Sequence, residues 1–347
     1  MTKSLSAIRT VPRHSCFLCG LKGEVVYEGL HDRLFRAPGT WTLKRCPGKD
    51  CGLVWLDPAP CRDEIWKAYT TYYTHQDNQR VSLNSLKRAY HFIRDCYLSL
   101  RYGYFPGESR SRLKWLGAVV YLFPGRRSDV DFSVMDLSNN PEGRLLEIGC
   151  GSGTLLDYMS SLGWQTAGLD IDPAAVALAR KKGLQVSCGT LEAQHYEDDM
   201  FDAVAMSHVI EHVPDPEVLL AECHRILKPG GVLSLVTPNI ESFGSSYFGR
   251  SWLHLDPPRH LMLYNCKALE KLVRKAGFTK VEIDTTVRDA HSLFWASLSI
   301  RRHGEFAMGT HPGPVLKSFL LLLRLMEWTL IKFLPRRGEE LSLKVVK

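Results

Sequence analysis

The most restrictive feature of this sequence is a short apolar run that leads into three alternating glycines and then into a helical pattern. Residues 145–148 form the run, and Gly149, Gly151 and Gly153 follow at every second position. Glycine permits tight turns and a close approach between backbone and ligand. The start of a helix leaves backbone N–H groups free to bind a polar or anionic group. The segment therefore predicts a strand, a ligand-binding loop and a helix.

The rest of residues 141–287 repeats this alternation of strand and helix. Short apolar runs at 145–148, 166–169, 204–206 and 232–236 are typical of buried parallel strands. Helical patterns occupy 154–162, 173–182, 216–227 and 267–276. A sixth strand is expected at 280–284, and alternating Leu341, Leu343 and Val345 predict a last strand at 340–346. The order predicts an α/β fold with a doubly wound sheet.

An acidic residue stands where a nucleoside-binding sheet would need one. Asp170 follows Gly153 by 17 residues, at the end of the second predicted strand. A carboxylate there can accept hydrogen bonds from both hydroxyls of a ribose. The third glycine comes one residue earlier than in the nicotinamide fingerprint G-x-G-x-x-G, so that cofactor is not favoured.

With these residues in place, the sequence resembles the class I S-adenosylmethionine (SAM)-dependent methyltransferases. The resemblance extends in order through Gly189-Thr190-Leu191, Phe201-Asp202-Ala203-Val204, His208-Val209-Ile210-Glu211-His212-Val213 and Leu227-Lys228-Pro229-Gly230-Gly231. It implies a Rossmann-like, seven-stranded methyltransferase sheet whose last strand is antiparallel. A Rossmann-like sheet that binds another nucleotide, or none, is the alternative.

The resemblance also implies a set of SAM contacts. Gly149, Gly151 and Gly153 would line the methionine part of SAM, Asp170 would hold the ribose, and Ile171 would lie against the adenine. Thr190 and Leu191 would border the adenine, Ser207 would close the pocket, and Glu147 belongs to the same set. Many relatives carry an acidic residue near Thr190, whereas here Glu192 lies two positions further on.

Histidines follow the fourth and fifth predicted strands, at the edge where ligands bind in open α/β sheets. Methyl transfer from a sulfonium needs a general base only when the acceptor is a poorly acidic hydroxyl or a carbon. Histidine titrates near the working pH, so His208, His212 and His260, with Glu211, are the candidate catalytic residues. The alternatives are a helix-start hydrogen-bond network and a rigid structural loop. The string also fits an inverted zinc-protease motif, but the flanking methyltransferase motifs explain it better.

Four early cysteines form two closely spaced pairs, Cys16-x2-Cys19 and Cys46-x4-Cys51. Four thiolates can enclose Zn²⁺ tetrahedrally, so we expect a structural zinc site in a small zinc-ribbon-like unit. Four unligated thiols are the alternative. Residues 51–58 also resemble zinc-containing N-terminal segments of methyltransferases that act on sugars and cell-surface glycans. The usual second pair is C-x2-C, and the departure affects Cys46 most.

These features divide the chain into five parts. We expect a zinc-binding unit at 1–75, a basic helical region at 76–140, the SAM-binding core at 141–287, a helical insert at 288–338 and the last core strand at 339–347. Residues 1–16 lack the apolar stretch of a signal peptide. No run of 18 uncharged apolar residues occurs either. We therefore expect a cytoplasmic protein.

The insert contains an amphipathic helical pattern at 315–334. Lys317, Arg324, Glu327 and Lys332 gather on one side of a helical wheel, opposite Phe319, Leu322, Met326, Leu330 and Phe333. Such a helix is suited to lie in a membrane interface. The basic stretch 84–127 and a net charge of +7 would favour an anionic membrane surface. Packing on the sheet and a dimer interface are the alternatives.

The leading functional hypothesis is a SAM-dependent methyltransferase acting on a small molecule, a sugar, a glycolipid or a lipid-linked acceptor, at a hydroxyl. One alternative is an RNA methyltransferase that grips phosphates with the zinc unit and the basic region. The fourth-strand motif argues against methylation of base amines, because an Asn/Asp-Pro-Pro-aromatic string is absent there. A non-catalytic SAM-binding or zinc scaffold protein is the third possibility.

Overall fold

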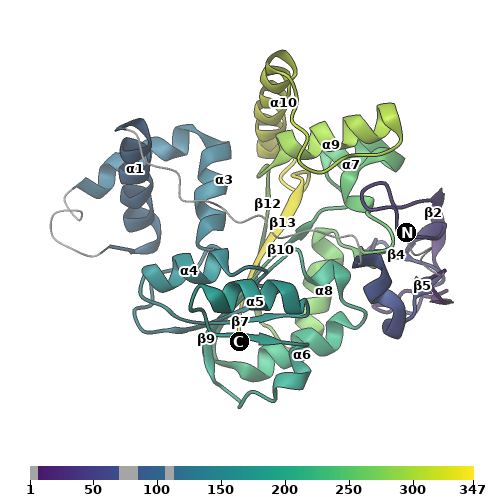
Figure 1. Cartoon of the computed structure of the whole chain (residues 1–347), viewed down its shortest axis with the longest axis horizontal. Helices are drawn as coiled ribbons and strands as arrows, with labels where there is room; N and C mark the ends of the chain where they lie inside the picture. Colours follow the sequence, from purple (N-terminus) through teal and green to yellow (C-terminus); the bar gives the residue numbers. More distant parts are fainter. Residues whose placement is uncertain (1–6, 70–84, 106–112) are drawn as a thin grey trace.

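The computed structural model describes residues 7–69, 85–105 and 113–347, and its centre is a seven-stranded sheet (Figure 1). The strand order is β12-β13-β10-β9-β6-β7-β8. The strands are β6 (Arg144–Ile148), β7 (Gln165–Asp170), β8 (Val186–Cys188), β9 (Phe201–Ser207), β10 (Leu227–Pro238), β12 (Lys280–Thr286) and β13 (Glu340–Val346). Only β13 in this sheet runs antiparallel to its neighbours, β10 and β12. The predicted methyltransferase sheet is confirmed.

Side chains that alternate along the central strands separate two layers of helices. In β6, Leu146 packs with the core under α6 (Pro216–Ile226) and α8 (Cys266–Lys275). The adjacent Leu145 packs on the opposite face with α1 (Ser85–Tyr102), α3 (Pro124–Ser133) and α4 (Thr154–Ser161). The sheet is therefore buried on both faces, as its continuous apolar runs predict.

Local sequence signals set several helix boundaries. Asp172 precedes α5 (Pro173–Lys181) and accepts a hydrogen bond from the backbone N–H of Ala174. Asn265 caps α8 in the same way through Ala268. Helix α6 ends one residue earlier than predicted, because Leu227 already pairs with β9 and the register of β10 shifts between Leu227 and Val232.

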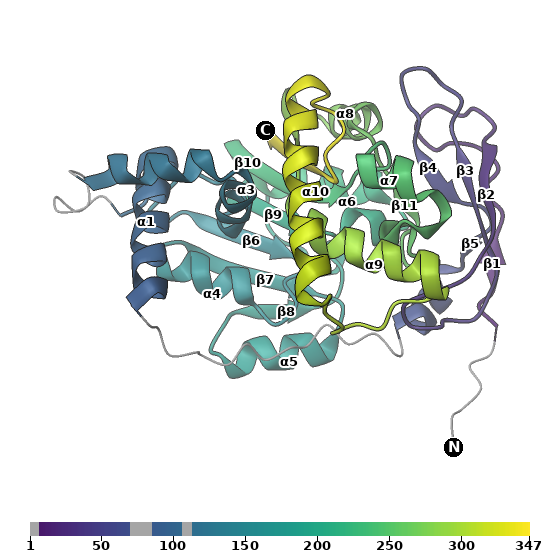
Figure 2. The same ribbon diagram turned by 90° about the horizontal axis from the view of Figure 1, so that it is seen from above.

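The N-terminal unit forms a second sheet that includes a short strand from the segment after β10. Strands β2 (Glu24–Leu30), β3 (Trp41–Arg45) and β4 (Val54–Leu56) are completed by β11 (Met262–Leu263). A separate pair joins β1 (Thr10–Val11) to β5 (Ala59–Pro60), and the 3₁₀ helix η1 (Arg62–Tyr69) follows. Figure 2 shows this unit at one end of the molecule, with α1 toward the other. The predicted boundary at residues 75 and 76 lies outside the described residues.

The insert between β12 and β13 folds into α9 (Ala290–His303) and α10 (Pro314–Phe333). Figure 1 shows α10 standing beyond the ends of these strands. Two of the four charged residues of α10 face the protein: Arg324 donates to the Gly125 carbonyl at 2.9 Å, and Glu327 is fully buried. Lys317 and Lys332 are exposed. Phe319, Leu322, Met326 and Phe333 are exposed, and Leu330 is half-buried. Among the described helices, none is long and apolar enough to span a membrane.

Candidate functional site

The carboxyl ends of β6, β7, β9 and β10 meet at one edge of the sheet, and the predicted site residues follow them. The glycine loop comes after β6, Asp170 ends β7, and Ser207 ends β9. The segment with the predicted His260 follows β10. The strand order thus brings residues from 147 to 260 to a single edge.

The three loop glycines have different surroundings. A Cβ at Gly149 would lie 2.4 Å from Val209, and a Cβ at Gly153 would lie 2.3 Å from Leu184. Gly151 has a φ of +52° and faces open space, with no heavy atom within 4 Å of an added Cβ. All three glycines have a positive φ, and at Gly149 and Gly153 an added Cβ would also press on a neighbouring side chain, whereas Gly151 borders space that a ligand can enter.

Asp170 is held beside this loop by backbone hydrogen bonds. Its Oδ2 accepts from the N–H of Gly151 at 2.7 Å, and its Oδ1 accepts from the N–H of Asp172 at 2.9 Å. Each oxygen of an ionised carboxylate has a second lone pair, so both can still accept from a ligand. The next residue, Ile171, leaves 64% of its surface exposed, which places an apolar side chain beside the Asp170 carboxylate.

Glu147 lies buried at the end of β6, just before the loop. Burial, followed by the charge of Asp170, raises the pKa of Glu147 well above its ordinary range. The described residues supply no hydrogen-bond partner for its Oε2 atom, although that atom is buried. A buried polar atom without a partner is costly, so Oε2 is available to a polar group of a ligand.

The remaining residues of the expected cofactor set differ in exposure. Thr190 is exposed and its carbonyl accepts from Gln194 at 3.2 Å. Leu191 is buried, so its side chain packs in the core and anchors the loop that follows β8. Ser207 is half-buried at the end of β9.

Four histidines form a chain of ring contacts at the same edge. The ring centroids of His208 and His254 are 5.8 Å apart, those of His254 and His260 are 6.1 Å apart, and those of His260 and His212 are 4.7 Å apart. His254, which lies in the short 3₁₀ helix η6 (Leu253–Leu255), was not among the site residues expected from the sequence. Its position six residues before His260 was the sequence feature that could have pointed to it.

Backbone carbonyls set the tautomers of His212 and His260. The Nδ1 atom of His212 is 3.1 Å from the Arg259 carbonyl, and the Nδ1 atom of His260 is 2.7 Å from the His254 carbonyl. A carbonyl only accepts, so each Nδ1 must donate a proton and each neutral ring keeps a lone pair on Nε2. Burial is the main reason that the pKa of each ring falls to about 4. Both histidines are therefore neutral near pH 7 and can accept a proton.

His208 has a different environment. Its Nδ1 is 3.2 Å from Glu211 and its Nε2 is 2.9 Å from Glu340. Arg288 also binds Glu340, and its Nη2 lies 3.1 Å from Nε2 of His208, so the cluster around this ring holds two carboxylates and one guanidinium. Burial lowers the pKa of His208, but the contacts with the two carboxylates outweigh it and raise the pKa to about 9. A protonated His208 balances the charge of this cluster and holds no lone pair for catalysis.

Glu211 joins the two halves of the histidine cluster. It is fully buried, and its Oε2 accepts from the Thr237 hydroxyl at 2.9 Å. Burial would raise the pKa of Glu211, but contact with His208 lowers it to about 2. Glu211, His212 and His260 offer one ligand atom each within 4.8 Å of one another. These three residues could therefore also hold a divalent cation.

The N-terminal unit contributes residues that the sequence analysis missed. The buried Arg259 makes two hydrogen bonds of 2.7 Å to Asp32, and it also pairs with Asp256. Tyr69, at the end of η1, places its hydroxyl 3.0 Å from Nδ1 of His212. Asp32 and Tyr69 lie far from the histidines in sequence, so no local pattern pointed to them.

The four predicted cysteines converge in the N-terminal unit. The Sγ atoms of Cys19 and Cys46 are 3.1 Å apart, those of Cys16 and Cys51 are 3.7 Å apart, and all four lie within 4.8 Å of one another. The N–H of Gly48 also points at the sulfur of Cys46, at 3.4 Å. Four converging sulfurs suit a tetrahedral thiolate site for zinc.

Comparisons with known proteins identify the family. A model of the methyltransferase domain matches residues 126–283. The ubiquinone biosynthesis O-methyltransferase of Cereibacter sphaeroides is 34% identical over 170 residues, which are 46% of this chain and 68% of that protein. The chain belongs to the class I SAM-dependent methyltransferases. Another methyltransferase of the same name, from Xanthomonas oryzae pv. oryzae, is 42% identical over 103 residues. That match spans 28% of this chain and 43% of the relative.

Solved methyltransferase structures are also similar. One is a SAM-dependent methyltransferase, possibly a histamine N-methyltransferase, from Thermotoga maritima, with 21% identity and a TM-score of 0.44. It aligns over 82% of this methyltransferase and 99% of its own chain. Phosphoethanolamine N-methyltransferase 2 from Haemonchus contortus, in complex with SAM, aligns over 60% and 49% with 19% identity and a TM-score of 0.41.

Proposed function

We propose that this chain is an O-methyltransferase that moves a methyl group from SAM to a hydroxyl of a small-molecule, sugar, glycolipid or lipid-linked acceptor. The observation that carries the proposal is the pair of neutral rings, His212 and His260, each with Nδ1 bound to a carbonyl, so that Nε2 carries the lone pair. A hydroxyl acceptor needs such a base, whereas an amine acceptor does not. The curated relatives are named O-methyltransferases, which agrees with this choice.

The residues at the sheet edge fit SAM. The open space at Gly151 would take the methionine part, Asp170 would bind the ribose hydroxyls, and Oε2 of Glu147 would meet a polar group of the cofactor. Ile171 and Thr190 would border the adenine, above Leu191, and Ser207 would close the pocket. Bound SAM would supply an activated methyl group. His212 or His260 would accept the hydroxyl proton on Nε2, with Glu211 and the charged His208 orienting these rings.

The direct test uses methyl-labelled SAM and a panel of acceptors. We expect purified protein to bind SAM and to transfer label to a hydroxyl of a sugar, glycolipid or lipid-linked compound. Salt-sensitive transfer to RNA would instead support the alternative in which the basic region holds nucleic acid. Binding of SAM without transfer to any acceptor would support a non-catalytic role.

A structural zinc ion at Cys16, Cys19, Cys46 and Cys51 is a second part of the proposal. Protein purified under reducing conditions should contain one equivalent of zinc. Cys19→Ser should lose this zinc and destabilise the N-terminal unit, while SAM affinity stays close to that of the wild type. Absence of zinc from fully reduced wild-type protein would refute the assignment.

We also propose peripheral association with an anionic membrane. The exposed apolar residues of α10 support it, and Trp115 and Leu122 of the 3₁₀ helix η2 (Lys114–Leu122) are exposed as well. Arg126 and Arg127 lie at the start of α3, next to η2 in the chain. Apolar side chains with nearby basic residues are the combination that binds anionic interfaces. Arg110 and Arg112, part of the predicted basic stretch, lie outside the described residues.

A further inference from the structure

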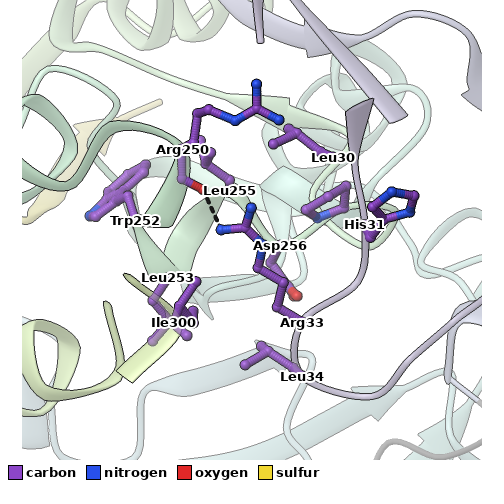
Figure 3. A pocket seen from close by; sticks show the side chains of 11 residues that line it. Leu30, His31, Arg33, Leu34, Arg250, Trp252, Leu253, Leu255, Asp256 and Ile300 are labelled. Atoms are coloured by element: carbon purple, nitrogen blue, oxygen red, sulfur yellow. Dashed lines mark hydrogen bonds between the residues drawn. The ribbon is translucent and has the colours of Figure 1, made fainter. Parts of the chain in front are cut away.

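A pocket opens where the N-terminal unit meets the segment before the histidines (Figure 3). Its walls come from the loop after β2, from residues 250–257 and from α9, and it is a small cavity of about 20 Å³ that opens to solvent. Trp252 and Asp256 line it, and the ring of Trp252 also contacts His254, with centroids 5.3 Å apart. The pocket therefore adjoins the histidine cluster but contains none of the residues expected to bind SAM.

Two arginines from different parts of the chain enter this pocket. Arg33 donates from Nη1 to the Arg250 carbonyl at 2.8 Å, as Figure 3 shows. Arg250 donates from Nη2 to the carbonyl of Glu28 at 2.8 Å. Within the described ranges, no carboxylate lies within 4.0 Å of either guanidinium, whereas nearby Arg36 is paired with Glu305. These two cations are thus held in place by neutral carbonyls alone.

The uncompensated charge makes the pocket suitable for an anion. Burial, and then the charge of Arg250, lower the pKa of Arg33, so a bound anion would relieve an existing repulsion. Each guanidinium has five N–H donors and keeps several free. The carboxylate of Asp256 also faces this region, but Arg259 binds it and offsets its charge. The side chain of His31 lines the same wall, with its Nδ1 held by the Gly39 carbonyl at 3.1 Å.

We propose that Arg33 and Arg250 bind a phosphate group carried by the methyl acceptor. A phosphate offers several oxygens and up to two negative charges, which match two forked guanidiniums better than a single carboxylate does. The group would anchor the acceptor on one side of η6, while its hydroxyl reaches His260 on the other. The identity of the ligand as the acceptor rests on the proposed methyltransferase function, but phosphate binding itself does not.

The first test measures the binding of inorganic phosphate and pyrophosphate to the full-length protein by calorimetry. We expect the double variant Arg33→Gln, Arg250→Gln to bind pyrophosphate at least about tenfold more weakly than the wild type. The double lysine variant, which keeps the charge but loses the forked geometry, should fall between them. Arg36→Gln is the matched control, since it removes one charge from the same loop outside the pocket, and should bind like the wild type.

Two results would overturn the proposal: no pyrophosphate binding by the wild type, or equal binding by the double glutamine variant when circular dichroism shows that it is folded. Neither depends on methyl transfer, so failure here is distinct from failure of the proposed function. Vesicles with and without phosphatidic acid then separate the sources of the phosphate. Weaker vesicle binding by the double variant would assign the group to a lipid, and unchanged vesicle binding to a soluble acceptor.

Discussion

Single residues at the sheet edge are distinguished by their surroundings more than by their type. Gly151 faces open space while Gly149 and Gly153 face side chains. Of the histidines, His208 lies between two carboxylates and is charged, whereas burial keeps His212 and His260 neutral. These differences assign separate tasks to chemically identical residues, and each task can be tested by substitution.

Replacing Asp170 should weaken SAM binding without unfolding the protein. Asp170→Ala removes the carboxylate proposed to bind both ribose hydroxyls, and hydrogen bonds to a charged group are worth about 1.5–3 kcal/mol. We therefore expect the Kd for SAM, measured by calorimetry, to rise by about 10–100-fold. Asp157→Ala, at an exposed position on α4, is the control. Tight SAM binding by Asp170→Ala would show that the cofactor lies elsewhere.

Replacing the proposed catalytic base should lower kcat and leave SAM affinity nearly constant. Loss of a positioned base costs about 10²–10⁴-fold in rate, so we expect this effect from either His260→Ala or His212→Ala. His224→Ala, on α6, is the control. A loss of rate with His260→Ala and only a loss of stability with His212→Ala would assign the base to His260. If neither changes kcat by more than about threefold, transfer relies on proximity alone.

Helix α10 differs from an ordinary amphipathic helix, because it turns two charged residues toward the protein and exposes apolar ones. Arg324 and Glu327 face the protein, and Glu327 lies near Glu339, which accepts hydrogen bonds from Ser242, Gly244 and Trp252. A buried carboxyl pair is stable only while it holds a proton. The helix is thus attached through a pH-sensitive contact and presents its apolar side outward.

The attachment of α10 should weaken as the pH rises. Burial, and then the charge of Glu339, raise the pKa of Glu327 above its ordinary value of 4.5. A raised pKa in the folded state means that this contribution to stability is complete below pH 4.5 and is lost as the pH rises. Glu327→Gln mimics the protonated acid, so we expect its Tm at pH 8 to exceed that of the wild type by about 2–4 °C.

The pH dependence of the difference is the decisive measurement for this carboxyl pair. The Tm values of wild type and Glu327→Gln should converge as the pH falls below 4.5, where the acid is protonated in both folded and unfolded chains. Glu305→Gln, at an exposed glutamate, should show no such trend. A Tm difference that stays constant from pH 5 to pH 9 would contradict the assignment.

The outer side of α10 should determine membrane binding. Phe319 and Leu322 are 52% and 64% exposed, so changing both to Ser should leave the fold intact. We expect wild type to bind anionic vesicles in sedimentation assays and to be released by salt, and the double variant to bind at least about tenfold more weakly. Val218→Ser, at an exposed apolar position on α6, is the matched control. Equal binding of wild type to neutral and anionic vesicles would argue against an electrostatic component.

Across the molecule, the N-terminal unit and the central sheet form one structure around the candidate site. Strand β11, which follows β10 in the chain, completes the N-terminal sheet, and the N–H of Leu56 donates to the Leu261 carbonyl at 3.0 Å. The buried pair of Asp32 and Arg259 connects the loop after β2 to the residue whose carbonyl binds His212. We infer that the N-terminal unit positions the histidines as well as holding the cysteine cluster.

Breaking the Asp32–Arg259 link should slow methyl transfer while zinc and SAM stay bound. Asp32→Asn keeps the shape but weakens the fork on Arg259, and misplaced catalytic groups cost up to about 10²-fold. We expect kcat to fall by about 10–100-fold, with zinc content and SAM Kd unchanged. Lys267→Ala is the control, because it removes an exposed contact, to the Lys49 carbonyl, between the same two parts. Equal losses of kcat in both variants would mean that only the general contact between the N-terminal unit and the central sheet matters.

Much of the central fold could be predicted from local patterns. The alternation of apolar runs and helical periods placed β6, β7, β9, β10, β12 and β13, because buried strands and amphipathic helices have different periods. Glycine spacing and the position of Asp170 predicted a loop at the carboxyl ends of the strands, since strand ends meet at one edge of a parallel sheet. The spacing of the cysteines likewise predicted that their four sulfurs would converge.

The parts that could not be predicted depend on contacts between distant segments. No local pattern indicates that Asp32 and Tyr69 reach Arg259 and His212, or that Met262 and Leu263 extend the N-terminal sheet. Helical periodicity separated the two sides of α10 but could not say which side faces inward. The amino-acid order was sufficient for the sheet, the glycine loop and the cysteine cluster, since each follows from neighbours along the chain. The charge states of the histidines and the orientation of α10 required the folded structure, because burial and through-space charge depend on residues far apart in sequence.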